Sequence, residues 1–230
     1  MKYVLIYTFL LMSVFHTSCG QNQTYAPPDI IKSETKDTVT SPGSNEKYQT
    51  KYEYTDSIGK SLIILNSFRQ GAPYIDPKGI SYGKVIFWTR LINETDSPVA
   101  LKIDFPVDSF EVPGLPGKYY KVLVPPDTMT IDKESLYDYG MTGLKPFLDN
   151  NTHKPSSLKR TINPKESSGF YVVILGLTEG AHGTMRTGLS LKGQNLFYRI
   201  NVDVTYSNTK SSNKEINCGS INLKNLVLRK

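Results

Sequence analysis

The sequence predicts an all-β fold in which residues 51–230 form a single two-sheet β-sandwich domain. About seven segments in this range have strand length and are rich in β-branched and aromatic residues. Turn-like segments separate them, and the 230-residue chain holds 17 Gly, 14 Pro, 15 Tyr and 9 Phe. Aromatic residues favour pleated sheets, whereas Gly and Pro favour tight turns. Because each sheet must bury one face, this many short strands favours two packed sheets.

The strand pattern is clearest in KVIFWTRLIN (84–93), which carries large apolar side chains on both of its faces. The two faces are Val85, Phe87, Thr89 and Leu91, and Ile86, Trp88, Arg90 and Ile92. Such a strand is expected to be buried on one face and partly covered on the other. ETDSP (94–98) has the composition of a turn, and VALKIDF (99–105) alternates again. These segments predict a strand–turn–strand unit.

Further strands are expected on both sides of this unit. Four segments have the length and composition of strands: SLIILNSF (61–68), KYYKVLV (118–124), GFYVVILGL (169–177) and NLFYRINVDV (195–204). A final pair of strands, KEINCG (214–219) and INLKNLVL (221–228), is expected to close the sheet. NETDSPVALKIDFP (93–106) resembles the paired-strand segment of immunoglobulin-like bacterial domains, and this resemblance implies an immunoglobulin-like sandwich.

A segment around 127–157 departs from the strand pattern and predicts an insertion of one or two short helices or a long ordered loop. Thr130 or Asp132 can cap a helix ahead of Leu136, and Pro146 is expected to stop one. The insertion also carries four ring side chains, Tyr137, Tyr139, Phe147 and His153. These rings either fold inward to cover an open end of the sandwich or form a platform for a ligand. Tyr137 and Tyr139 are the candidate ligand-binding residues of the insertion.

The connection EGAHGTMRTG (179–188) places His182 and Arg186 in a Gly-rich segment. An imidazole and a guanidinium on such a loop can bind an anionic group or a sugar. The segment can equally be a β-hairpin turn, in which the glycines meet backbone demands and His182 is merely exposed. His182 and Arg186 are therefore candidate ligand-binding residues, with the turn as the alternative.

Signatures of catalysis are absent from the sequence. It contains no G-x-S-x-G elbow and no Gly-rich motif for phosphates or dinucleotides. The widely separated His153 and His182 match no metal-ligand spacing, and an acidic group in the insertion lacks the EF-hand pattern: Asp127, Asp132, Glu134 and Asp138. We therefore expect no metal, no cofactor and no enzyme activity. The formal net charge is +6, but the basic residues are scattered, so a nucleic-acid partner is not expected either.

The first 18 residues have the pattern of an export signal. Lys2 supplies the positive charge, residues 3–15 are apolar, and Thr17 and Ser18 are the small residues that precede a cleavage point. The apolar run is shorter than the roughly 20 residues that a membrane-spanning helix needs. We expect residues 1–18 to be removed as a signal peptide.

Cys19 follows directly, within the tripeptide SCG (18–20). An apolar core that leads through small residues into Cys resembles the lipobox of bacterial lipoproteins, in the relaxed form of the Bacteroidetes group. His16 stands where that family usually has an aliphatic residue. The resemblance implies that Cys19 becomes the mature N-terminus and carries a diacylglyceryl thioether and an N-acyl chain such as palmitate. The alternative is a disulfide between Cys19 and Cys218 in an oxidising compartment.

Residues 19–50 connect this cysteine to the domain and are expected to form a disordered tether, because they hold few large apolar residues and no periodic pattern. Several acyl chains on Cys19 would anchor the protein stably without a spanning helix. The sequence thus indicates a lipoprotein of the bacterial cell envelope, at the outer membrane and facing the periplasm or the exterior. Loops of its sandwich would bind a protein or glycan partner. Two alternatives stay open: an envelope enzyme acting on polysaccharide or peptidoglycan, and a purely structural envelope component.

Overall fold

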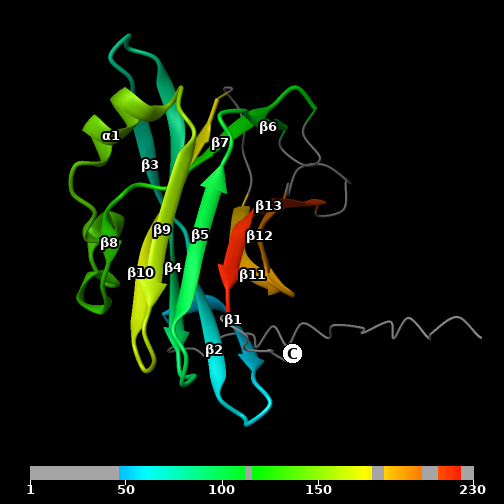
Figure 1. The fold of residues 1–230 in the computed structure, drawn as a ribbon. Coiled ribbons are helices and arrows are strands. Elements are labelled where there is room, and N and C mark those ends of the chain that lie inside the picture. The colour runs from blue at the N-terminus through cyan, green and yellow to red at the C-terminus, as the bar shows by residue number, and fades with distance from the viewer. Residues whose placement is uncertain (1–46, 112–115, 178–183, 204–211, 224–230) are drawn as a thin grey trace, which may run out of the picture. The chain divides into compact units, whose positions relative to one another are not determined.

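Two antiparallel β-sheets pack face to face in the computed structural model, which describes residues 47–111, 116–177, 184–203 and 212–223 (Figure 1). The prediction of an all-β sandwich is confirmed. The described residues all belong to one unit, Lys36–Lys230. Within these residues, no helix is both long and apolar enough to cross a bilayer. Cys19 and the tether up to residue 46 lie outside the described ranges.

The larger sheet contains eight strands. They are β1 (Tyr48–Thr55), β2 (Ser61–Ser67), β3 (Gln70–Ile75), β4 (Ser81–Asn93), β6 (Phe110–Glu111), β7 (Tyr119–Leu123), β8 (Thr128–Met129) and β10 (Ser167–Gly176). The central path runs β1-β2-β4-β10-β7-β6, while β3 pairs with β4 and β8 pairs with β10. The long strand β4 therefore pairs with β2 and β3 along one edge and with β10 along the other.

The smaller sheet contains five strands in the order β11-β12-β13-β5-β9. They are β5 (Val99–Phe105), β9 (Ser156–Ile162), β11 (Thr184–Lys192), β12 (Asn195–Asp203) and β13 (Ser212–Asn222). The expected break between the final two strands was wrong, because β13 continues through 214–219 to Asn222, the start of the second segment, while 224–228 lie outside the described residues. Gly219 makes this possible: its φ is +141°, and a Cβ there would lie 2.0 Å from the carbonyl oxygen of Lys102 on β5. The chain passes through this point as an irregular strand and not as a turn.

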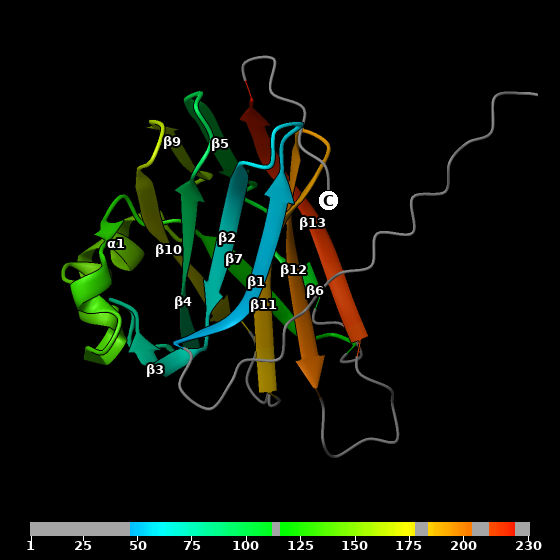
Figure 2. The ribbon, with the colours of Figure 1, turned by 90° about the horizontal axis from the view of Figure 1, so that it is seen from below.

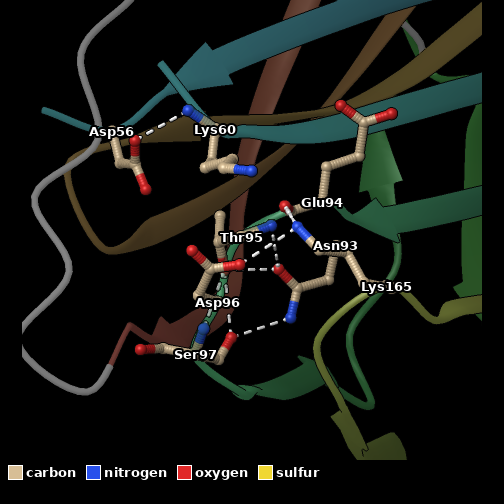
Figure 3. A network of polar contacts seen from close by, with 8 residues as sticks. All are labelled: Asp56, Lys60, Asn93, Glu94, Thr95, Asp96, Ser97 and Lys165. Atoms are coloured by element: carbon tan, nitrogen blue, oxygen red, sulfur yellow. Dashed lines mark hydrogen bonds and ion pairs between the residues drawn. The ribbon is translucent and has the colours of Figure 1, made fainter. Parts of the chain in front are cut away.

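β4 and β5 are the predicted strand–turn–strand unit, but they lie in different sheets. The side chain of Asn93 fixes the crossover between them, as Figure 3 shows. Its amide nitrogen donates to the carbonyl oxygens of Ser97 (2.9 Å) and Ile162 (3.0 Å), and its amide oxygen accepts from the backbone nitrogen (3.1 Å) and hydroxyl (2.6 Å) of Thr95. Lys165 adds an ion pair with Asp96 at 3.1 Å. The crossover is thereby a fixed corner of the fold.

The two faces of β4 enter two separate apolar clusters. Phe87 and Leu91 are buried in the core between the sheets. Ile86 and Trp88 are buried in a second cluster on the outer face of the larger sheet. The sequence expectation of a strand with two apolar faces is therefore confirmed, and the outer face is covered more completely than expected.

The insertion supplies this cover. It consists of β8, two 3-10 helices, η1 (Ile131–Lys133) and η2 (Tyr137–Gly140), and one helix, α1 (Leu144–Asn151). Figure 2 shows α1 beside β4 and β10, on the side away from β12 and β13. Pro146 does not stop this helix, because it occupies the first turn, where a backbone N–H has no partner within the helix.

Two ion pairs and a tyrosine attach the insertion to the sheet. Lys84 of β4 pairs with Asp138 at 2.8 Å, and Arg90 of β4 pairs with Glu134, all four side chains being nearly buried. The hydroxyl of Tyr139 donates to the carbonyl oxygen of Phe68 at 2.7 Å. Two of the four acidic residues noted in the insertion, Glu134 and Asp138, thus hold it against the sheet, a structural use that their sequence spacing did not reveal.

Asn66 of β2 joins the two sheets along one seam. Its amide oxygen accepts from the backbone nitrogen of Leu189 on β11 (2.8 Å) and from the Thr89 hydroxyl (2.9 Å). Its amide nitrogen donates to the carbonyl oxygen of Leu189 (3.1 Å) and to the Thr50 hydroxyl (3.0 Å). The amide of Asn66 thereby satisfies the backbone N–H and C=O of Leu189, which a further strand would otherwise bind on this free edge of β11. A Cβ on Gly188 would lie 3.2 Å from this amide nitrogen, so the seam is closely packed.

We expect Asn66→Ala to lower the free energy of unfolding by about 3 kcal/mol, because it leaves a buried N–H and C=O of Leu189 without partners. Chemical denaturation measures this loss. Asn150→Ala is the matched control, since Asn150 is exposed and donates only to the carbonyl oxygen of Pro146 in its own helix. Equal losses in the two variants would contradict the role given to Asn66.

Candidate functional site

A cavity of about 320 Å³ lies beside β7 and β10 of the larger sheet. The connections β3–β4 and β5–β6, the residues that follow α1 and the end of β10 surround it. Its lining residues are Asp76, Lys78, Ile80, Tyr82, Val107, Ser109, Lys121, Thr152, His153, Leu175 and Leu177. In Figure 1 the β3–β4 connection lies at the opposite end of the larger sheet from the β1–β2 connection. The volume is at the lower end of the range for small-molecule sites.

The β3–β4 connection forms a fixed rim of the cavity. The carboxylate of Asp76 accepts hydrogen bonds from the backbone nitrogens of Lys78 (2.9 Å) and Ile80 (2.8 Å). Its second oxygen accepts from the hydroxyl of Tyr82 at 3.4 Å. Gly79 takes φ +84°, which a residue with a side chain rarely adopts. Asp76 therefore orders the turn that presents Ile80 at the rim.

Lys121 of β7 is the unusual residue of the cavity. Its neighbours Tyr120 and Val122 enter the core between the sheets, so Lys121 points to the outer face. The side chain is only 3% exposed, and its ammonium donates to the carbonyl oxygen of Thr152. Burial lowers the pKa of Lys121, and the negative charge of Asp108 opposes this shift. A charged group in a cavity with a perturbed pKa marks a functional-site candidate.

In contrast to the buried ammonium of Lys121, the rim of the cavity exposes apolar side chains. Ile80, Val107 and Leu177 are 50%, 45% and 36% exposed, although each is a large hydrophobic residue. Leu175 lines the interior and is buried. His153 is exposed at the cavity. The cavity thus combines a buried ammonium with an apolar rim, an arrangement that suits a ligand with one polar and one apolar part.

The candidate residues from the sequence lie elsewhere. Tyr137 is 76% exposed on η2, whereas Tyr139 is 5% exposed, with its ring edge-on to Trp88 at 6.4 Å between centroids. Tyr139 therefore serves the packing of the insertion, as the inward-folding alternative expected. Arg186 is exposed on β11 of the smaller sheet, and His182 lies outside the described residues. The structure does not bring Tyr137, Tyr139 and Arg186 together.

Of the two segments that carried these candidates, the insertion contributes to the cavity, whereas no described residue of 179–188 lines it. Thr152 and His153 follow α1 of the insertion, and Leu177 directly precedes residues 178–183. The interpretation of 179–188 as a turn was wrong for its second half, because Thr184 already pairs with Asp203 in the β11–β12 ladder. Sequence reasoning missed Lys121 because a lone lysine in an alternating strand usually faces solvent.

Cys218 on β13 lies in the core between the sheets with 0% exposure. Its thiol donates to the carbonyl oxygen of Leu196 at 3.5 Å. Burial raises the pKa of this thiol to about 12. Cys218 is therefore an inert packing residue in the folded protein.

Two further features of the described residues are weaker candidates. A shallow hollow of about 350 Å³ on the smaller sheet is lined by Lys102, Lys159 and Arg160, among others. Arg160 is already engaged with the Thr128 hydroxyl at 2.9 Å, and Lys102 pairs with Asp104 at 2.7 Å. Within the described ranges, no group of three or more His, Cys, Asp or Glu side chains is placed to hold a metal ion.

Neither a comparison with protein-family models nor a search of curated proteins found a match for this chain. Function is therefore inferred from the cavity and from the sequence. Among the features that the structure describes, the cavity is the one that combines a buried charge with exposed apolar side chains.

We expect Lys121→Met to change how stability depends on pH. The pKa of Lys121 is lowered in the fold from 10.5, so between the two pKa values the unfolded chain binds more protons than the folded one. The free energy of unfolding of the natural protein should therefore rise with pH, relative to Lys121→Met, from about pH 7 to about pH 10.

Chemical denaturation of the natural protein and of Lys121→Met at both pH values measures the difference in their free energies of unfolding. Groups that titrate alike in the two proteins do not contribute to it. Lys60→Met, at an exposed position, serves as the control for removing a lysine charge. A relative stability that falls over this range would contradict the shift given to Lys121.

Proposed function

We propose that this protein is a lipid-anchored, non-catalytic component of the bacterial cell envelope that binds a partner molecule at the cavity around Lys121. The cavity is the observation that carries the binding role, because an apolar rim beside a buried ammonium is the chemistry of a recognition site. The anchor is proposed from the signal segment and the lipobox-like sequence before Cys19. An immunoglobulin-like topology is likewise proposed from the sequence, because 93–106 resembles the paired-strand segment of immunoglobulin-like bacterial domains.

The burial of Cys218 supports acylation of Cys19 over a disulfide. A disulfide would require the N-terminal segment to enter the core beside β13, where the Cys218 sulfur has no exposed surface. An acylated Cys19 needs no such rearrangement. With several chains on one residue, membrane binding is stable, since each buried methylene contributes about 0.8 kcal/mol.

The alternatives receive less support. A glycosidase-like enzyme needs two carboxylates that face one another, whereas Asp76 is the one carboxylate among the described residues that line the cavity. Both of its oxygens accept hydrogen bonds within the rim. A purely structural component accounts for the hydrogen bond of Lys121 to Thr152 but not for the exposed apolar side chains around the same cavity.

Cys19→Ala should move the full-length protein from the membrane fraction to the soluble fraction, because it removes the acylated sulfur. Detergent phase partition and intact mass of the natively expressed product measure the change. Cys218→Ala is the matched control and should stay in the membrane fraction with the acyl mass present. An unmodified Cys19, or a bond between the two sulfurs, would contradict the proposal.

Ile80→Glu should reduce capture of the partner at least tenfold, because it places a charge on the apolar rim. Ile58→Glu is the matched control, since Ile58 is 70% exposed in the β1–β2 connection, at the other end of the larger sheet (Figure 1). Pull-downs from detergent-solubilised envelope and glycan arrays measure capture. Partners retained equally by both variants, or blank results from both assays, would contradict binding at the cavity.

A further inference from the structure

The chemical class of the ligand follows from the groups that Lys121 meets and those it does not meet. A lysine ammonium has three N–H donors, and the carbonyl oxygen of Thr152 accepts one of them. Among the described residues, no carboxylate forms an ion pair with Lys121. Since Lys121 lines the cavity while being 3% exposed, its remaining donors have little access to bulk water.

The one carboxylate among the described lining residues is engaged within its own turn. Asp76 accepts hydrogen bonds from the turn and from Tyr82 with its two oxygens. Asp108 acts on Lys121 only as a charge through space. The other titratable groups that line the cavity are Lys78 and His153, and neither of these supplies a negative charge. The cavity therefore presents a buried cation without a direct anionic partner.

We propose that the cavity selects ligands that carry a carboxylate on a small apolar body, with Lys121 binding the carboxylate and Ile80, Val107 and Leu177 contacting the apolar body. A charge-assisted hydrogen bond in a site of low polarity is stronger than one in water, and a buried charge gains most from a partner. The inference rests on the proposed function and specifies its ligand.

The size of the cavity limits the body of the ligand. About 320 Å³ is near the lower limit for ligand sites, which suits one amino-acid derivative or short acyl group better than an oligosaccharide chain. The same chemistry has two sources, a free small acid and the C-terminal residue of a peptide. Both present an apolar group next to a carboxylate.

Three matched probes test the two halves of the ligand separately. N-acetyl-leucine has both the carboxylate and the apolar body. N-acetyl-leucinamide lacks the charge, and N-acetylglycine lacks the apolar body. Titration of the full acylated protein in lipid nanodiscs, with empty nanodiscs as the blank, should show N-acetyl-leucine binding at least tenfold more tightly than either of the others. Equal affinity for the acid and the amide, or no binding of any probe, would overturn the inference.

Variants then identify Lys121 as the group that recognises charge. Lys121→Met should abolish the preference for acid over amide, whereas Lys60→Met should retain it. His153→Gln measures how much the imidazole contributes to the preference for acid over amide. If that preference were lost in His153→Gln but kept in Lys121→Met, the assignment to Lys121 would be overturned. Should Lys121→Met fail to fold, the natural protein still decides: affinity for the acid should fall as pH rises through the pKa of Lys121, while affinity for the amide should not.

A tripeptide that ends in leucine separates the two sources. Affinity at least equal to that of N-acetyl-leucine supports a peptide C-terminus, and exclusion of the tripeptide supports a free acid. Failure here is distinguishable from failure of the proposed function. Envelope capture that depends on Ile80 but not on Lys121 would leave the binding role intact and overturn the carboxylate specificity.

Discussion

Side chains that replace missing strands hold the two sheets together at their edges. Every buried backbone N–H and C=O requires a partner, and an edge strand turned toward the other sheet has none within its own ladder. Asn66 supplies both partners for Leu189 at one seam. Ser156 does the same at the other: its hydroxyl accepts from the backbone nitrogen of Val124 (2.5 Å) and donates to its carbonyl oxygen (3.0 Å). The sandwich is thereby closed by side chains along both edges.

This closure reaches the cavity through the chain between α1 and β9. Ser156 fixes the start of β9 against the end of β7, only a few residues after Thr152. The ion pairs of Lys84 and Arg90 hold the preceding part of the insertion on the outer face of the larger sheet. Thr152 is thus positioned over Lys121 from both directions. A preorganised contact of this kind lowers the cost of ordering a site when a ligand arrives.

Sequence patterns predicted the strands well where apolar side chains alternate over a long run. The two apolar faces of 84–93 predicted the double burial of β4, and VALKIDF matched β5. β1 was missed because YQTKYEYT is mostly polar, and β9 because Arg160 puts a charged side chain where the alternation calls for an apolar one. Strand prediction uses local alternation, whereas the pairing of β4 and β5 with different sheets depends on distant partners.

The cavity was beyond the reach of those patterns for a related reason. Lys121 is covered by Thr152, 31 positions further along the chain, and a local sequence pattern does not indicate a contact over that separation. The insertion itself was correctly placed around 127–157, and the inward folding of Tyr139 follows from the need to cover Trp88. Which of its residues reach the cavity is a property of three-dimensional packing, so Thr152 and His153 became visible only in the structure.

The place of β13 in the smaller sheet bears on when the chain can fold. β5, near the middle of the sequence, finds one of its two neighbours in β13, close to the C-terminus. Closing a loop over so many residues makes that pairing a late step in folding. β13 is also the strand that joins β11 and β12 to β5 and β9, so the smaller sheet stays in two separate pieces until this long-range pairing forms.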